Sequence, residues 1–231
     1  MSEFDKFARD YESILSESIS AYGFSPSYFD EYKIREAYKF VKSEGLGNKQ
    51  IKFLNFGCGT GRSEKFIRKY FKKSIIFSID VSEKSIEIAR ENNRELDNMV
   101  FKSFDGYQIP FEDRFDIIFA ANVFHHIAHE EHPVVLKRIY QNLNENGFLF
   151  IFEHNPLNPL TVKIVRSCEL DRDAKLLSPF YTNRILSQNG FGWRRLRFML
   201  FFPKYFRFLL PLEKYMGKIP FGAQYYFAAQ K

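Results

Sequence analysis

The chain has 231 residues, two cysteines and a formal net charge of +6. This length suits one domain with a full hydrophobic core, and no Gly/Ser- or Pro-rich stretch divides it. The cysteines follow no secretory pattern, and no apolar window reaches the roughly 18 residues of a transmembrane helix. The composition therefore argues against a disulfide scaffold and a membrane-spanning protein, and it favours a cytoplasmic location.

Helices are predicted first, because apolar residues recur at helical spacing over Phe4–Leu15 and Tyr28–Glu44. Strands and helices then alternate. The strands are predicted at Ile51–Phe56, Ile75–Asp80, Met99–Phe104, Phe115–Ala121 and Gly147–Glu153, and the helices between them at Ser63–Phe71, Ser82–Asn92 and Glu131–Leu143. Because each strand is apolar throughout, the pattern indicates a parallel sheet covered on both faces.

The rhythm changes after Glu153. Proline turns and a helical stretch are predicted over Asn155–Ser178, and a helix over Pro179–Gln188. Two further strands, Trp193–Phe202 and Tyr225–Lys231, flank a helical or irregular arm over Tyr205–Met216. The prediction is an α/β, doubly wound, Rossmann-like sheet of seven strands with an antiparallel last strand, preceded by N-terminal helices.

The strongest motif is Leu54-Asn55-Phe56-Gly57-Cys58-Gly59-Thr60-Gly61, between the first strand and its helix. Alternating glycines permit a tight turn that a ligand approaches closely. A carboxylate, Asp80, ends the second strand, where it can accept both hydroxyls of a ribose. The dinucleotide fingerprint needs glycine where Arg62 stands, and the P-loop pattern is absent. The motif therefore favours a nucleoside that carries an amino acid.

With these segments in order over about residues 50–155, the chain resembles class I S-adenosylmethionine (SAM)-dependent methyltransferases, particularly those of ubiquinone and menaquinone biosynthesis. The other matching segments are Phe77–Ser82, Phe104–Gly106, Phe115–Ile118 and Gly147–Phe152. The resemblance implies one domain over 1–231, with a helical lid (1–48), a SAM-binding core (50–155), and an acceptor-side insert with C-terminal strands (156–231). It also implies an enzyme that converts SAM to S-adenosylhomocysteine.

The resemblance also implies roles for individual residues. Gly57, Gly59 and Gly61 would line the methionine part of SAM, with Asn55, Phe56 and Cys58 in the same turn. Asp80 would hold the ribose, and Val81 would pack on the adenine. Asp105 would accept from the adenine amino group beside Gly106, Asn122 would lie near the transferring methyl, and Tyr11 would cover the cofactor. The family usually has an acid where this chain has Asn55, so affinity would be weaker or another acid would substitute.

A narrower resemblance begins at Glu153-His154-Asn155-Pro156 and continues through Asn158–Thr161 to Asp171 and Asp173-Ala174. These segments are similar to a subgroup of poorly characterised bacterial methyltransferases. This subgroup implies no particular acceptor. The function predicted for the chain as a whole is methyl transfer from SAM to an oxygen of a small-molecule or lipid-linked acceptor.

Four of the five histidines, His125, His126, His129 and His132, fall within eight residues. The zinc pattern H-E-x-x-H fails because position 133 is proline, so no metal site is predicted, and His129 and His132 are expected at the exposed start of a helix. His125, His126 and His154 follow strands at the edge where ligands bind. His126 or His154 is predicted to be a general base, with packing or substrate shape as the alternative.

Residues 193–231 combine twelve aromatic residues with eight basic residues and one acidic residue. Core strands with basic edges are the favoured reading, and peripheral contact of residues 193–218 with an anionic membrane is the alternative. Aromatic stacking on single-stranded nucleic acid is a third reading, and it is disfavoured.

Two other functions stay open. An RNA or protein methyltransferase is disfavoured because Ala121-Asn122-Val123-Phe124 lacks the Asn-Pro-Pro-Tyr type of signature for amino-group methylation. A non-catalytic SAM-binding scaffold would be compatible with Asn55.

Overall fold

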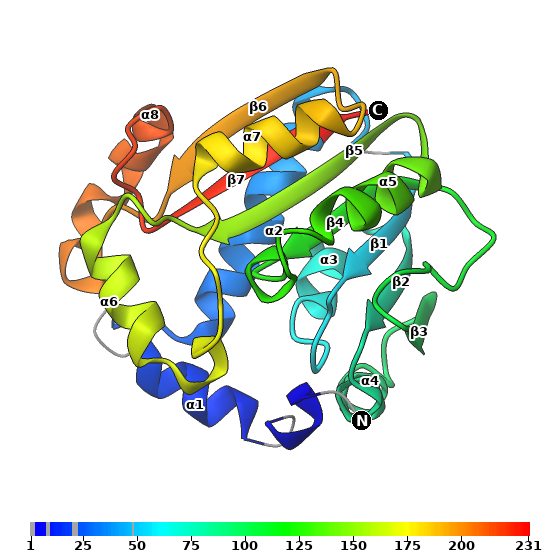
Figure 1. Ribbon diagram of the computed structural model, residues 1–231, viewed down its shortest axis with the longest axis horizontal. Coiled ribbons are helices and arrows are strands. Elements are labelled where there is room, and N and C mark those ends of the chain that lie inside the picture. The colour runs from blue at the N-terminus through cyan, green and yellow to red at the C-terminus, as the bar shows by residue number, and fades with distance from the viewer. Residues whose placement is uncertain (1–2, 8–9, 20–22, 48) are drawn as a thin grey trace.

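A computed structural model describes residues 3–7, 10–19, 23–47 and 49–231. Its centre is a seven-stranded sheet in the order β3-β2-β1-β4-β5-β7-β6 (Figure 1). The strands are β1 (Lys52–Phe56), β2 (Ile75–Asp80), β3 (Met99–Ser103), β4 (Phe115–Ala121), β5 (Leu143–His154), β6 (Trp193–Met199) and β7 (Gln224–Gln230). The first five pair in parallel, and β7 runs antiparallel between β5 and β6. The predicted fold class is confirmed.

Helices cover both faces of this sheet. They are α1 (Tyr11–Ser18), α2 (Pro26–Ser43), α3 (Glu64–Tyr70), α4 (Glu83–Asn92), α5 (His132–Asn142), α6 (Pro159–Ser167), α7 (Pro179–Gln188) and α8 (Glu213–Met216). Short 3-10 turns are η1 (Glu3–Lys6), η3 (Phe124–His126), η4 (Glu169–Asp171) and η5 (Lys204–Leu212). Within the described part of the chain, no helix is long and apolar enough to cross a membrane.

Two apolar clusters explain why the strands are apolar throughout. Leu54 packs with α5 and α7 on one face of the sheet, and its neighbour Phe53 packs with α2 and α3 on the other. Both side chains are fully buried. Since successive side chains of a strand point to opposite faces, both faces of β1 must be apolar.

The structure corrects several predicted boundaries. The first predicted helix is divided into η1 and α1, because η1 packs on α4 whereas α1 packs on α2, α6 and η4. Strand β5 begins four residues early, at Leu143, which pairs with Phe115 across a register shift in β4. Strand β6 ends at Met199, because Leu200 has a positive φ of 61°. By contrast, the predicted cap of α4 is confirmed, since the Ser82 side chain accepts from the backbone N–H of Ser85.

The carboxyl ends of β1, β2, β4 and β5 meet at one edge of the sheet, as parallel strands require. In Figure 1 this is the lower edge, and α1, α6 and η4 lie beyond it. Segments from both ends of the core therefore surround the edge where ligands bind in such sheets.

Candidate functional site

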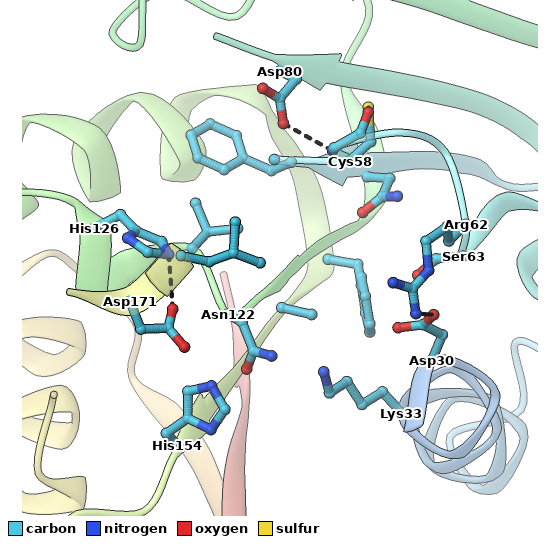
Figure 2. A pocket seen from close by; sticks show the side chains of 18 of the residues that line it. Asp30, Lys33, Cys58, Arg62, Ser63, Asp80, Asn122, His126, His154 and Asp171 are labelled. Carbon is cyan, nitrogen blue, oxygen red and sulfur yellow. Dashed lines mark hydrogen bonds and ion pairs between the residues drawn. The ribbon is translucent and has the colours of Figure 1, made fainter. Parts of the chain in front are cut away.

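A cavity of about 420 Å³ opens at this edge. Its wall combines the glycine turn after β1, the ends of β2 and β5, the loops after β3 and β4, and side chains of α1, α2, α6 and η4. A volume of this size suits a small organic ligand. Most of the residues predicted from the sequence line it, and Figure 2 shows several of them around one space.

The three glycines of the turn serve different purposes. All have positive φ, at 75° for Gly57, 52° for Gly59 and 74° for Gly61. A Cβ on Gly57 would lie 2.5 Å from Val123, and one on Gly61 would lie 2.8 Å from Ala89. A Cβ on Gly59 would meet no described atom within 4 Å. Packing therefore requires glycine at positions 57 and 61, and Gly61 does not line the cavity. Gly59 lines the cavity and leaves its face open to a ligand.

Asp80 is held beside this turn by its two carboxylate oxygens. Oδ2 accepts from the backbone N–H of Gly59 at 2.8 Å, and Oδ1 accepts from that of Ser82 at 2.9 Å. Burial raises the pKa of the Asp80 carboxyl, although these backbone hydrogen bonds oppose the rise. Asp80 and Val81 both line the cavity. The carboxylate is therefore fixed in direction and keeps acceptor capacity for a ligand.

Asp105 follows β3 on the same side of the cavity. Its Oδ1 accepts from the backbone N–H groups of Gln108 and Tyr107, and these bonds lower the pKa of its carboxyl. Gly106 has a φ of 88° and also lines the cavity. The loop after β3 thus forms a wall next to Asp80 and Val81.

Asn55 stands where an acid was expected from the resemblance, and its side chain contacts a nearby buried acid. The Asn55 side-chain amide donates to Glu64 Oε1 at 2.8 Å, and Ser78 Oγ donates to the same oxygen at 2.8 Å. Glu64 is fully buried, which raises the pKa of its carboxyl, and its Oε2 has no hydrogen-bond partner among the described residues. Because the Asn55 amide N–H₂ points back to Glu64, its oxygen is the atom left for the cavity. An acid is present, but it lies behind Asn55 instead of replacing it.

Asn122 directly follows β4, with a φ of 57°. Its backbone N–H donates to the carbonyl of Phe152 at 2.8 Å, and its side-chain oxygen is buried with no hydrogen-bond partner among the described residues. A buried, unpaired amide oxygen is costly unless a ligand donates to it. Asn122 therefore offers the cavity an acceptor that no described group uses.

The histidines after β4 and β5 form a charged cluster. Glu153 is fully buried and accepts from the backbone N–H of Phe124 at 2.9 Å, and its other oxygen lies 2.5 Å from His125 Nδ1. Asp171 Oδ1 lies 3.3 Å from His125 Nε2 and 3.4 Å from His126 Nε2. The sequence motif identified these acids as part of a resemblance and gave neither a role.

Burial and neighbouring charges shift the pKa values of His125 and His154 in opposite directions. Burial opposes the charge on His125, but the neighbouring carboxylates of Glu153 and Asp171 outweigh it and raise the pKa of His125 to about 10. Burial, reinforced by the positive charge of His125, lowers the pKa of His154 to about 4. Burial raises the pKa of the Asp171 carboxyl, but hydrogen bonding with His125 and His126 outweighs it and holds that pKa far below its usual range.

The structure therefore distributes the predicted catalytic residues unevenly. His126 and His154 line the cavity, whereas His125 lies behind its wall. His132 is fully buried, so its predicted exposure is wrong: its ring nitrogens contact Tyr181 Oη and the carbonyl of Phe124, both at 2.9 Å. The side chain of Tyr11 lies outside the described residues.

Sequence reasoning missed a cationic wall on α2. Lys33 is buried, lines the cavity, and has a pKa lowered by that burial. Beside it, Arg62 Nη2 and Asp30 Oδ2 form an ion pair of 2.5 Å (Figure 2). The available signal was a lysine four residues before Ala37, on the apolar stripe of α2.

Comparison with known proteins agrees with this geometry. The family model for a methyltransferase domain matches residues 53–147. Malonyl-[acyl-carrier protein] O-methyltransferase of Bacillus cereus is 29% identical over 121 residues, which are 52% of this chain and 44% of the relative. An uncharacterised methyltransferase of Staphylococcus carnosus is 28% identical, covering 66% of this chain and 67% of its own. The matches span less than half the length of the malonyl-[acyl-carrier protein] O-methyltransferases of B. cereus and B. anthracis.

Solved structures show the same fold. A SAM-dependent methyltransferase of Thermotoga maritima has a TM-score of 0.68 at 17% identity and covers 99% of this chain and 97% of its own. Phosphoethanolamine N-methyltransferase 2 of Haemonchus contortus, in complex with SAM, has a TM-score of 0.61 at 18% identity. The match covers 85% of this chain and 52% of that protein. Residues 53–147 therefore match a methyltransferase domain, and the strand order and the whole chain show the fold of SAM-dependent methyltransferases of known structure.

Proposed function

We propose that this protein transfers a methyl group from SAM to an oxygen of a small-molecule, carrier-held or lipid-linked acceptor. The observation that carries the proposal is the shared cavity: the glycine turn and Asp80 line one part of it, and His126 and His154 line another. SAM, when bound, supplies an electrophilic methyl group on a sulfonium. Cofactor and acceptor would then share one enclosed space, as direct transfer requires.

The residues fit SAM in chemistry as well as in shape. Asp80 would accept from the ribose hydroxyls, and the open face of Gly59 would admit the methionine part. The oxygens of Asn55 and Asn122 would accept from the ammonium and its neighbourhood, which would satisfy the unpaired Asn122 acceptor. Val81, Asp105 and Gly106 would form the adenine wall. Cys58, in the same turn as Gly57, also lines the cavity.

His126 is the best placed general base of the three candidates. It lines the cavity, and Asp171 lies 3.4 Å from its Nε2, where a carboxylate stabilises the imidazolium formed on taking a proton. His154, with a pKa of about 4, would be a neutral hydrogen-bonding group at neutral pH. His125, behind the wall, would position Asp171.

The outer surface supports a lipid-linked acceptor. Between β6 and β7, the side chains of Tyr205, Phe208 and Tyr215 are 81%, 71% and 75% exposed. Basic Arg207 and Lys214 accompany them. Aromatic residues among basic ones favour the interface of an anionic membrane. The proposal therefore includes peripheral membrane contact through residues 193–218 by a protein of the cytoplasm.

Calorimetric titration with SAM and with S-adenosylhomocysteine tests the cofactor site. We expect micromolar binding, and we expect Asp80→Ala to weaken it at least ~100-fold, because two hydrogen bonds to a charged group contribute about 3 kcal/mol or more. Asp97→Ala, an acid outside the cavity lining, is the control. Folded protein that binds neither ligand would refute the proposal.

A methyl-transfer screen over phenolic, carboxylic and lipid-linked acceptors then tests turnover. His126→Gln is expected to lower turnover on hydroxyl acceptors without weakening SAM binding. Turnover that persists unchanged in His126→Gln would remove the general base from the proposal. SAM binding with no turnover on any acceptor would favour the scaffold function.

A further inference from the structure

Three side chains from three separate elements converge beside the acceptor part of the cavity. They are His125 on η3, His154 at the end of β5, and Asp171 on η4. Each offers one ligand atom, and these atoms all lie within 4.8 Å of one another. In Figure 2, His154 and Asp171 face the same part of the cavity, with Asn122 beside them. The chain thus brings two imidazoles and one carboxylate to one point.

His125 is prepared as a ligand by its surroundings. Its side chain is fully buried, and Nδ1 lies 2.5 Å from Glu153 Oε2, which fixes the ring. Its Nε2 is buried and lies 3.3 Å from Asp171 Oδ1, in an ion pair that a metal ion would replace by displacing the Nε2 proton. A carboxylate that fixes one ring nitrogen, while the other nitrogen faces the remaining ligands, is the usual arrangement of a metal-binding histidine.

The spacing also fits an ion. Ligands at about 2.0–2.1 Å from a tetrahedral ion lie roughly 3.3–3.4 Å from one another. His125 Nε2 and Asp171 Oδ1 are separated by 3.3 Å, which already matches this value. Because all the ligand atoms lie within 4.8 Å of one another, the third ligand needs to approach by at most roughly 1.4 Å, which is within reach of side-chain rotation. Without an ion, the same separation is that of the ion pair between His125 and Asp171.

We propose that His125, His154 and Asp171 bind one divalent transition-metal ion, with Glu153 as the carboxylate behind His125. Imidazole and carboxylate donors suit ions such as Zn²⁺ or Fe²⁺. Glu153 and Asp171 supply two negative charges, which match that of the ion. The sequence predicted no metal because H-E-x-x-H fails around His129, whereas this set comes from the ends of two strands and a distant turn.

This site rests on the proposed function for its role, because it lies where the acceptor would bind. A three-ligand site leaves a coordination position open for an exogenous oxygen. An acceptor hydroxyl bound there would lose its proton more readily, and His126 is placed to receive that proton.

Cobalt(II) titration of the full chain, after removal of metals with a chelator, tests the site independently of activity. We expect one equivalent of Co²⁺ to bind with micromolar or tighter affinity, seen by calorimetry and by the visible absorption of bound cobalt. Asp171→Asn and His154→Gln should each weaken binding at least ~10-fold. His129→Gln is the control, because His129 stacks on Tyr181 outside this cluster. Circular dichroism checks that each variant is folded.

Wild-type protein that binds no Co²⁺ would overturn the metal site, as would binding that His154→Gln and Asp171→Asn leave unchanged. SAM titration of the same samples separates this result from the proposed function. Loss of cobalt binding with intact SAM binding would remove only the metal, whereas cobalt binding without SAM binding would refute the cofactor site and leave the metal site standing.

Discussion

Gly59 allows the cofactor site to be tested apart from stability. A Cβ at Gly59 would meet no described atom within 4 Å, and Gly59 lines the cavity. Gly45 has the same freedom, with nothing described within 4 Å, but it lies outside the cavity lining. Both glycines have positive φ, at 52° and 79°. Gly59→Ala and Gly45→Ala therefore add the same methyl group to comparable backbones, one inside and one outside the site.

The two variants should lose similar stability. An alanine held in the left-handed region costs about 1–2 kcal/mol. For a chain of this size, that loss lowers Tm by roughly 2–8 °C. Binding should differ, because only the Gly59→Ala methyl occupies space that the methionine part of SAM would need. Displacing the ligand from one or two hydrogen bonds costs about 2.8 kcal/mol, or roughly a 100-fold loss of affinity.

Differential scanning calorimetry and SAM titration of the two variants give the answer. We expect comparable Tm values, near-normal SAM affinity for Gly45→Ala, and strongly weakened affinity for Gly59→Ala. If Gly59→Ala bound SAM as tightly as Gly45→Ala did, the cofactor would not approach this turn, and the reasoning from the glycine face would be wrong.

Two further predictions concern stability and surface contact. Burial raises the pKa of Glu64, so the folded protein favours its protonated form and loses stability as pH rises above the usual glutamate value and through the raised one. Glu64→Gln should therefore gain stability relative to wild type as pH is raised. Urea unfolding from pH 4.5 to 8 measures the difference in free energy of unfolding between the two proteins, and a difference that stayed constant would contradict this prediction. The wild-type protein should co-sediment with anionic liposomes at low salt and be released at high salt. The double variant Tyr205→Ser, Phe208→Ser should bind less. Equal binding of the wild type to neutral liposomes would argue against a role for the basic residues.

The sheet could be predicted because its signals are local. Runs such as Ile75–Asp80 and Phe115–Ala121 have the predicted bounds, since strands buried on both faces are apolar without interruption. Positions where tertiary packing decides were harder to predict. One example is η1, which contacts α4 and whose Asp5 accepts from Ser82 Oγ at 2.6 Å across a long stretch of sequence.

Only those residues of the candidate site that belong to a sequence motif could be predicted. Gly57, Gly59 and Asp80 could be placed because strand ends and turns carry their own sequence signature. Lys33, by contrast, is on a helix far upstream and enters the cavity only through packing of α2 on the sheet. Position along the chain could not show that Asp171 would lie between His125 and His126.

The place of β7 in the sheet has a consequence for how the protein folds during synthesis. Strand β7 is the last strand in sequence, yet it lies between β5 and β6, and Phe148 pairs with Gln230. Such pairing of distant segments is slow to form because a long loop must close first. Until residues 224–230 leave the ribosome, β5 has a free edge and β6 has no neighbour. Gln224 also belongs to the cavity wall, so a nascent chain cannot complete the site before its final strand is inserted.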